Sequence, residues 1–447
     1  MSKPVDPGLF PAPALPLGRR HLLTGFGLTA LGGSLAGLAA SARADDRQTQ
    51  SAPHATDAPV DGVASPNDTV AYLGVHQAGI VTPRPANGMV ASFAVLADTP
   101  DALETLFKTL TARIAFLTVG GAVPQLDPKL PPADSGLLGP VIRPDALTIT
   151  LSVGASLFDE RPWLAPHKPR HLSRMTRFPN DALDADLCHG DLSIQICANT
   201  QDTTIHALRD LIKATSRQLV LRWKQEGTVP VIAPRPDDRP ESARNFLGFR
   251  DGSANPDSSD APTMDRVVWV GRQDGEPAWA VGGSYQAVRL IRNFVERWDR
   301  TPFGEQERIF GRTKITGAPL DKPDGHETDG PDYAADRDGR KTPLDSHIRL
   351  ANARDAAAQE NLILRRPFNY SNGVTKSGQL DQGLLFIAYQ ANLDRGFIAV
   401  QNKLNNEPLE EYIKPIGGGY FYTLPGIIEA SDYVGSTLVA AARGVSP

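Results

Sequence analysis

The sequence predicts an α+β protein in which helices alternate with the strands of an antiparallel sheet. Three observations support this class: apolar runs of strand length recur along the chain, amphipathic segments of helical spacing separate them, and the same order of elements occurs twice. The chain has 447 residues and is 40% hydrophobic, which is enough for more than one core. We therefore expect a globular protein with two related α+β halves that share a sheet or face each other.

The first half contains the clearer elements. Strands are expected at four apolar or alternating segments, namely 70–80, 88–97, 146–158 and 191–200. Helices are expected at 99–117 and 203–219, where apolar residues fall at helical spacing. Thr99 suits an N-cap and Pro100 suits the first helical position, so the first helix has a defined start.

The second half repeats this order after a segment rich in proline and charge, 224–245, which marks a domain boundary. Strands are expected within 264–270, 279–294, 383–390 and 417–426, and helices within 294–311 and 391–404. The long polar segment 321–343 is expected to be a solvated loop, because its acidic residues do not match the spacing of a calcium-binding loop.

The N-terminus has the features of an export signal. Arg19 and Arg20 precede a weakly apolar region that ends in the cleavage pattern Ala42-Arg43-Ala44. A twin-arginine signal over 1–44 and a disordered linker over 45–67 are therefore expected, followed by domains at 68–235 and 236–447. The alternative is a membrane anchor, but the glycines make the region a poor membrane span. No stable membrane span is expected after cleavage.

Composition and motifs exclude several functions. The net charge is −5 and no basic cluster stands out, so no nucleic-acid partner is expected. Motifs of zinc proteases, P-loop enzymes, dinucleotide-binding domains and α/β-hydrolases are absent. Cys188 and Cys197 fit two buried small side chains, and a single disulfide between them remains open.

Three segments carry residues suited to chemistry. The first is GFRDGSAN, with Asp251 and Asn255; the second is LDSHIRLANAR, with His347; the third is NLILRRPFNY, with Arg365 and Arg366. Each segment alone has a structural explanation, as a turn, a structural histidine and arginines beside an apolar strand. Spacing alone does not decide between these interpretations.

In combination, the segments resemble a known family. The chain resembles the dye-decolourising peroxidases in eight features taken together. These are the twin-arginine signal and the segments HQAGI, GFRDGSANP, GSYQAVRLIRNFVERWDRTPFGEQERIFGR, DSHIRLANAR, LRRPFNYSNG, GQLDQGLLFIAYQ and GGGYFYTLPG. The chain is most similar to their exported bacterial branch, called deferrochelatase/peroxidase. The resemblance covers nearly all of the mature chain, from about Tyr72 to Val434.

The resemblance implies two ferredoxin-like domains with antiparallel sheets, of the dimeric α/β-barrel type. One haem b (iron protoporphyrin IX) per chain would be held mainly by the C-terminal domain. By resemblance, His347 is the proximal iron ligand, Asp251 the distal acid/base and Arg365 the distal arginine, with Asn255 lining the distal side. The residues that would wrap the haem and its propionates are Gly252, Ser253, Ala254, Asn352, Ala353, Arg354 and Arg365.

Two details of the site remain open in this resemblance. A carboxylate is expected to orient the proximal histidine, and the segment PLEEYI offers Glu410 or Glu411, of which we favour Glu411. The family pattern also predicts Asn-Pro-Arg after the histidine, whereas this chain has Ala353 in place of the proline. A looser turn is expected there, without loss of a ligand.

The implied function is a haem peroxidase that uses hydrogen peroxide to oxidise dye-like or phenolic reductants. The alternative is a deferrochelatase that releases iron from haem for uptake and leaves the porphyrin intact. A haem carrier without enzymatic activity is a third hypothesis. The expected partners are peroxide and a small-molecule reductant or haem, while a homodimer and components of an iron-uptake system also stay open.

Overall fold

The structure, a computed structural model, describes residues 65–124, 127–230, 232 and 241–445. All of them belong to one compact unit of the chain. The predicted signal peptide and nearly all of the predicted linker lie outside the described residues, as do several residues near the predicted domain boundary.

The described residues contain eleven strands, ten α-helices and six short helical turns. The strands are β1 (Asn87–Val95), β2 (Gly121–Ala122), β3 (Val141–Ile142), β4 (Thr148–Gly154), β5 (Leu192–Ala198), β6 (Leu219–Thr228), β7 (Ser284–Asn293), β8 (Leu364–Arg365), β9 (Phe368–Val374), β10 (Leu380–Gln390) and β11 (Ile413–Thr423). The α-helices are α1 (Pro100–Val119), α2 (Ala155–Asp159), α3 (Gln201–Ala214), α4 (Ala261–Val267), α5 (Val295–Trp298), α6 (Phe303–Phe310), α7 (His347–Ala351), α8 (Ala356–Gln359), α9 (Ala399–Lys403) and α10 (Ser436–Ala442). The short turns are η1 (Ala165–His167), η2 (Ala185–Leu187), η3 (Arg272–Asp274), η4 (Ala278–Ala280), η5 (Asp394–Ile398) and η6 (Pro408–Glu411).

Eight strands form a closed antiparallel ring. Their order is β7-β11-β4-β5-β1-β6-β9-β10, and β10 pairs back with β7 along nine residues. β8 adds to β10 as a short extra strand, while β2 and β3 pair separately. The contact between β6 and β9 consists of one register pair, Thr228 with Asn369, so it is the shortest junction of the ring.

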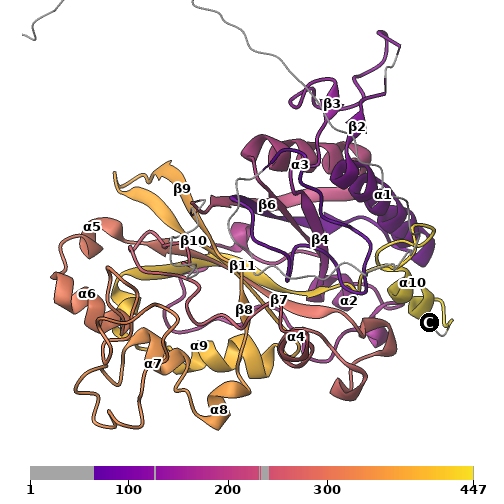
Figure 1. The fold of residues 1–447 in the computed structure, drawn as a ribbon. Helices are drawn as coiled ribbons and strands as arrows, with labels where there is room; N and C mark the ends of the chain where they lie inside the picture. The colour runs from indigo at the N-terminus through magenta and orange to yellow at the C-terminus, as the bar shows by residue number, and fades with distance from the viewer. Residues whose placement is uncertain (1–64, 125–126, 231, 233–240, 446–447) are drawn as a thin grey trace, which may run out of the picture. The chain divides into compact units, whose positions relative to one another are not determined.

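Each half of the chain contributes four neighbouring strands in the same order. β1 pairs with β5 and β6, and β5 pairs with β4; likewise β7 pairs with β10 and β11, and β10 pairs with β9. In both halves the first strand therefore lies between the third and the fourth, as in a ferredoxin-like sheet. The predicted α+β class with antiparallel, ferredoxin-like sheets is confirmed (Figure 1).

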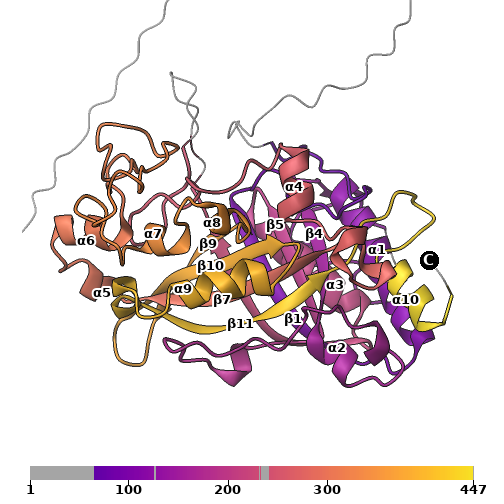
Figure 2. The ribbon, with the colours of Figure 1, turned by 90° about the horizontal axis from the view of Figure 1, so that it is seen from below.

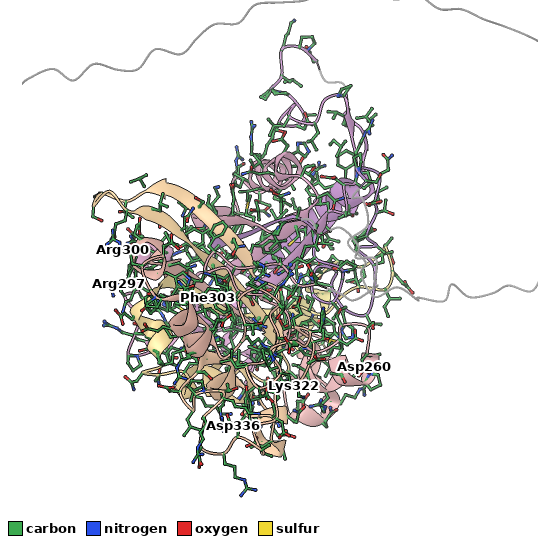
Figure 3. All side chains as sticks on the ribbon, turned by 60° about the vertical axis from the view of Figure 1, so that its left-hand side comes forward. Asp260, Arg297, Arg300, Phe303, Lys322 and Asp336 are labelled. Atoms are coloured by element: carbon green, nitrogen blue, oxygen red, sulfur yellow. The ribbon has the colours of Figure 1, made fainter. Side chains whose placement is uncertain are left out.

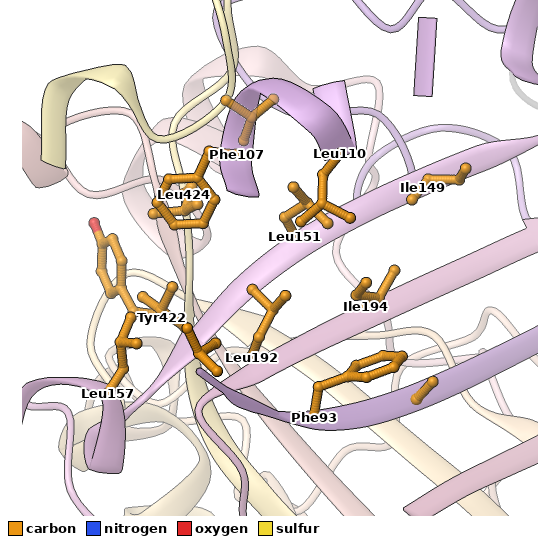
Figure 4. Packing of buried hydrophobic residues seen from close by; sticks show 14 of the residues in the cluster. Phe93, Phe107, Leu110, Ile149, Leu151, Leu157, Leu192, Ile194, Tyr422 and Leu424 are labelled. Carbon is orange, nitrogen blue, oxygen red and sulfur yellow. The ribbon is translucent and has the colours of Figure 1, made fainter. Parts of the chain in front are cut away.

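α1 shows how the sequence places a helix on this sheet. The Thr99 hydroxyl accepts a hydrogen bond from the Ala102 backbone N–H at 3.2 Å, as predicted for the N-cap. Phe107 and Leu110 are fully buried on the sheet, and Figure 4 shows them close to Leu151 of β4. Burial of this apolar face, rather than propensity alone, fixes the helix.

Two predicted strands differ from the structure, and strands β6 and β9 were not predicted. Segment 70–80 is irregular rather than a strand, and segment 264–270 begins inside helix α4. Asp260 caps α4 through the Thr263 N–H at 3.4 Å, a start signal that the apolar run masked. Strand β6 was missed because polar side chains on its exposed face resemble a linker.

The structure decides the state of the cysteines and of the polar loop. Cys188 and Cys197 are both buried and free, so they form no disulfide. The loop 321–343 is not fully solvated as predicted, because Glu327 and Asp336 are buried within it. In the described part of the chain, no helix has the length and apolarity needed to cross a membrane.

Candidate active site

A large cavity lies in the second half of the chain. Its volume is about 1760 Å³, counting its open mouth. Among the described residues that line it, all except Asn180 lie at or after Asn245 in the chain. Its walls come from the loop 245–254, from α7 and α9, and from strands β7, β10 and β11. Figure 2 shows α7, α8 and α9 next to one another over this part of the sheet.

His347 begins helix α7 and lines the cavity. Its Nδ1 lies 2.7 Å from Oε2 of Glu407, whose side chain is 3% exposed. Desolvation lowers the pKa of His347, but the charge and hydrogen bond of Glu407 outweigh this effect and raise the pKa above its ordinary value. Nε2 has no hydrogen bond to any described residue, so it is available to a ligand in the cavity.

The predicted carboxylate partner, Glu411, is wrong. Its side chain is 61% exposed and lies 3.7 Å from Arg297. Glu410 borders the cavity, and burial raises the pKa of its carboxyl group, but it makes no hydrogen bond or ion pair with His347. The turn η6 begins just after Glu407 and directs Glu411 outward, so the partner is the glutamate before Pro408.

Asp251 and Arg365 form an ion pair at the same cavity. Arg365 Nη1 donates to Oδ1 of Asp251, and their side chains are 26% and 11% exposed. The two charges also act in opposite directions on the pKa of His347, since Arg365 lowers it and Asp251 raises it. A cation and a carboxylate are therefore close to each other and to the imidazole.

Asn255 does not line the cavity. Its side-chain amide instead pairs with the backbone of Arg365: Nδ2 donates to the Arg365 carbonyl at 2.7 Å, and Oδ1 accepts from the Arg365 N–H at 3.1 Å. The two bonds imitate a strand pairing and fix the backbone from which the Arg365 side chain extends.

The remaining predicted wall residues divide into two groups. Ser253, Ala254, Asn352 and Arg354 line the cavity, whereas Gly252 and Ala353 do not. A Cβ on Gly252 would lie 2.6 Å from Cβ of Ser242, so this glycine makes room for Ser242. Arg354 has a φ of 62°, and Oδ1 of Asn352 accepts its N–H at 3.0 Å, which holds the turn without the proline of the family pattern.

Arginines gather at one part of the cavity wall. Arg312 is 5% exposed, and its pKa is lowered by burial first and then by the charge of Arg354. Arg365 lowers it further, although Glu327 acts in the opposite direction. Arg354 is exposed, and its guanidinium has no hydrogen-bond or ion-pair partner among the described residues, so this group of arginines can accept an anion.

Two models of one family match the two halves of the chain. The N-terminal model of Dyp-type peroxidases matches residues 77–228, and the C-terminal model matches residues 242–428. The chain belongs to the Dyp-type peroxidase family. It is therefore a haem-dependent enzyme of a family that uses peroxide, as the sequence predicted.

Curated relatives cover almost the whole chain. A protein from Escherichia coli O6:K15:H31 (strain 536 / UPEC), named "Deferrochelatase", is 57% identical over 425 residues, which span 94% of this chain and 96% of the relative. A protein of the same name from Escherichia coli (strain K12) is 56% identical over the same lengths.

Solved structures of the family have the same fold. The Dyp-type peroxidase from Cellulomonas bogoriensis aligns with a TM-score of 0.73 and 34% identity, covering 84% of this chain and 99% of that one. A structure described as ferric DtpA from Streptomyces lividans aligns with a TM-score of 0.73 and 30% identity, covering 86% and 100%.

The groups at the cavity fit the haem of Dyp-type peroxidases. His347 offers an unpartnered Nε2 whose ring is oriented by a buried carboxylate, which is the arrangement of a metal-binding imidazole. Leu247, Phe249 and Phe386 supply apolar wall for a flat ring. The arginine group supplies cations suited to propionates, so the chemistry of the cavity agrees with the cofactor of the family.

Sequence reasoning missed several residues at the site. Glu407 is 60 residues from its partner in the chain, Arg312 ends the segment that begins at Gly283 but was given no role there, and Glu327 lies in the loop that was expected to be solvated. Arg349, two residues after His347, bonds to the carbonyls of Asp336 and Thr342. No local pattern marks any of these contacts.

Proposed function

We propose that this chain binds one haem b and uses hydrogen peroxide to oxidise phenolic or dye-like reductants. The proposal rests on one observation: a single cavity joins an imidazole with a free Nε2 to the ion pair of Asp251 and Arg365. The bound haem supplies the redox chemistry, reducing peroxide by two electrons and recovering them one at a time from the reductant.

His347 would hold the iron through Nε2. Its Nδ1–H donates to Glu407, which fixes the tautomer and gives the imidazole more electron density to share with the metal. Arg354 and Arg312 would lie near the propionates, where a carboxylate relieves the repulsion between the two guanidinium groups.

Asp251 would act as the acid/base. As the O–O bond of peroxide breaks, one oxygen loses a proton and the other gains one, and a single carboxylate within reach of both can move it. The guanidinium of Arg365 would hold the peroxide and stabilise the negative charge that develops on the leaving oxygen.

Substitution of the two groups tests the catalytic roles. Asp251→Ala and Arg365→Ala should each lower peroxide-dependent dye oxidation by about 10²-fold or more, while the Soret band of the bound haem is retained. Asp257→Ala, an exposed carboxylate in the same loop, should leave turnover unchanged. His347→Ala should alter the iron coordination spectrum; an unchanged spectrum would remove the assignment of the iron ligand.

The names of the curated relatives support a second candidate, a deferrochelatase that takes haem as substrate and leaves the porphyrin intact. The same cavity and the same imidazole would serve it. Purified protein incubated with haem under anaerobic, peroxide-free conditions decides between them: metal-free porphyrin supports the deferrochelatase, and its absence restricts the chain to peroxidase chemistry.

We also propose export by the twin-arginine pathway to the periplasm or beyond, on the strength of Arg19, Arg20 and the cleavage pattern that follows them. Lysine at both arginine positions should leave the protein in the cytoplasmic fraction. A homodimer, and contacts with components of an iron-uptake system, belong to this proposal as partners that sedimentation and co-purification would test.

A further inference from the structure

The acidic loop 321–343, here called the strap, contacts both sides of the proposed haem site. Figure 3 labels Lys322 and Asp336 within it. Two of its acidic residues, Glu327 and Asp336, are buried although the sequence around them is strongly polar. Burial of a carboxylate is costly unless hydrogen bonds or ion pairs compensate it, so both groups need partners in the interior.

Glu327 holds the segment that carries Asp251. Its carboxylate accepts the backbone N–H of Ser242 at 2.8 Å and the hydroxyl of Ser253 at 2.8 Å, and it also accepts the hydroxyl of Ser242. Arg250 adds an ion pair at 3.6 Å. The contacts therefore lie on both arms of the hairpin in which the Asp251 N–H bonds to the Ala243 carbonyl.

The other end of the strap holds the helix that carries His347. Arg349, two residues further along α7, donates to the carbonyls of Asp336 and Thr342 at 2.8 Å each. Its guanidinium also lies 3.3 Å from the Asp336 carboxylate and 4.8 Å from the ring centre of Tyr333. This end of α7 is therefore attached to the strap.

The strap is also fastened to the cavity wall between these two points. Arg312 Nη1 donates to the carbonyls of Gly317 at 2.7 Å and Glu327 at 2.8 Å. Asp336 accepts the backbone N–H groups of Arg340 and Thr342, both at 2.9 Å, which gives its end of the strap a fixed shape. A loop held by this many hydrogen bonds is rigid, so it can fix the position of the two segments that it contacts relative to each other.

We propose that the strap sets the position of Asp251 relative to His347, with Glu327 and Arg349 as positioning residues. This inference rests on the proposed function, because it concerns the same two groups. A displacement of about 1 Å in a catalytic group can cost about 100-fold in rate, so contacts that fix both groups through one loop bear directly on turnover.

The decisive variant is Glu327→Ala. We expect kcat for peroxide turnover to fall by about 10- to 100-fold, the KM for the reductant to stay constant, and the pH profile of kcat to shift. The iron coordination spectrum should match the parent, because the other end of the strap still holds α7. Glu327→Gln has the same shape and still accepts the Ser242 N–H, so it should recover most of the loss.

Arg349→Ala tests the opposite end. It should change the iron coordination spectrum and weaken haem retention, whereas the pH profile of kcat should follow the parent. Asp338→Ala is the matched control within the strap, because its exposed carboxylate pairs only loosely with exposed Arg340, at 3.4 Å. It should behave as the parent in every assay.

The outcomes separate the two proposals. If Glu327→Ala behaves like Asp338→Ala while Asp251→Ala is inactive, the strap has no positioning role and the peroxidase assignment stands. If Asp251→Ala retains full activity, the peroxidase assignment itself fails. Should Glu327→Ala not fold, Ser242→Ala removes one hydroxyl from Glu327, and an unchanged kcat and pH profile in that variant would overturn the proposal.

Discussion

At the scale of single residues, the contact between His347 and Glu407 explains how the imidazole of the candidate site is oriented. The buried carboxylate fixes Nδ1 and leaves Nε2 toward the cavity. Glu411, four residues further on, lies in solvent beside Arg297. Two glutamates in one short stretch thus have unrelated environments, and only the fold distinguishes them.

Glu407→Ala should lower haem affinity or peroxide turnover by about 10- to 100-fold, because the oriented hydrogen bond to Nδ1 is lost. Haem titration followed by the Soret band measures the first quantity, and steady-state kinetics the second. Glu411→Ala is the matched control and should change neither. Equal behaviour of the two variants would show that the contact with Nδ1 has no effect on the site.

Gly252→Ala should destabilise the protein by about 1–3 kcal/mol, since the new methyl group would lie 2.6 Å from Cβ of Ser242 and force the hairpin apart. Urea unfolding measures the change. Gly330→Ala serves as the control, because a Cβ there would have no atom of the described residues within 4 Å. A loss as large in the control would refute packing against Ser242 as the cause.

At the scale of elements, α10 is attached to α1 by charge. Arg443, which follows α10, contacts Asp101 at the start of α1 and bonds to Glu104 at 2.5 Å. Hydrogen bonds from Lys108, which has the larger effect, and from Arg443 lower the pKa of Glu104 to about 2. The pKa of Glu104 is lower in the folded state than in the unfolded state. The contact therefore stabilises the folded state at pH values above the ordinary carboxyl pKa, and this stabilisation is lost as pH falls toward about 2.

We therefore expect the protection of the α10 amide protons against hydrogen exchange to decrease below about pH 4, after correction for the pH dependence of the intrinsic exchange rate. Hydrogen exchange at several pH values measures this. Glu104→Gln should remove most of the pH dependence, while added salt should weaken the contact in the parent because the groups lie at the surface. Protection that is constant with pH would contradict the role of Glu104.

Elements with strong local signals were predictable. α1 has a capping threonine, a proline at its start and one apolar face, and β1 and β5 are apolar runs of strand length. β6 and α4 were not predictable, because neighbours in space decide them. β6 pairs with β1 despite its polar residues, and Asp260 starts a helix in an apolar segment that would equally suit a strand.

At the scale of the whole molecule, a chain of polar side chains crosses the interior of the ring of strands. Gln286 Nε2 on β7 donates to the Tyr389 hydroxyl on β10 at 2.8 Å, and this hydroxyl donates to Oε1 of Gln195 on β5 at 2.8 Å. All three residues are almost completely buried. Strands from both halves are thereby joined through the interior as well as around the ring.

Tyr389→Phe should cost about 1–3 kcal/mol, because both glutamines would be left buried without this partner. Chemical denaturation measures the loss. Tyr370→Phe is the control, since the buried Tyr370 hydroxyl has no hydrogen-bond partner in the part of the chain that the structure describes, so its removal should not destabilise the protein. The same cost in both variants would show that the loss is not due to the hydrogen bonds of Tyr389.

Only those residues of the candidate site that lie in a recognisable sequence motif were predictable. The GFRDG segment, His347 and the arginine after the LIL run were found through resemblance to a family. Glu407, Arg312 and Glu327 were not found, because their roles arise from contacts between segments that are distant in sequence. Local patterns cannot encode such contacts, and the buried acids of the strap were hidden by the polar residues around them.

The ring of strands depends on contributions from both halves, and this has a consequence for biosynthesis. Without the other half, either half would expose two unpaired edge strands, which can associate with other polypeptides. A nascent chain must therefore wait for its last strand, β11, before any stretch of it is safe from such association.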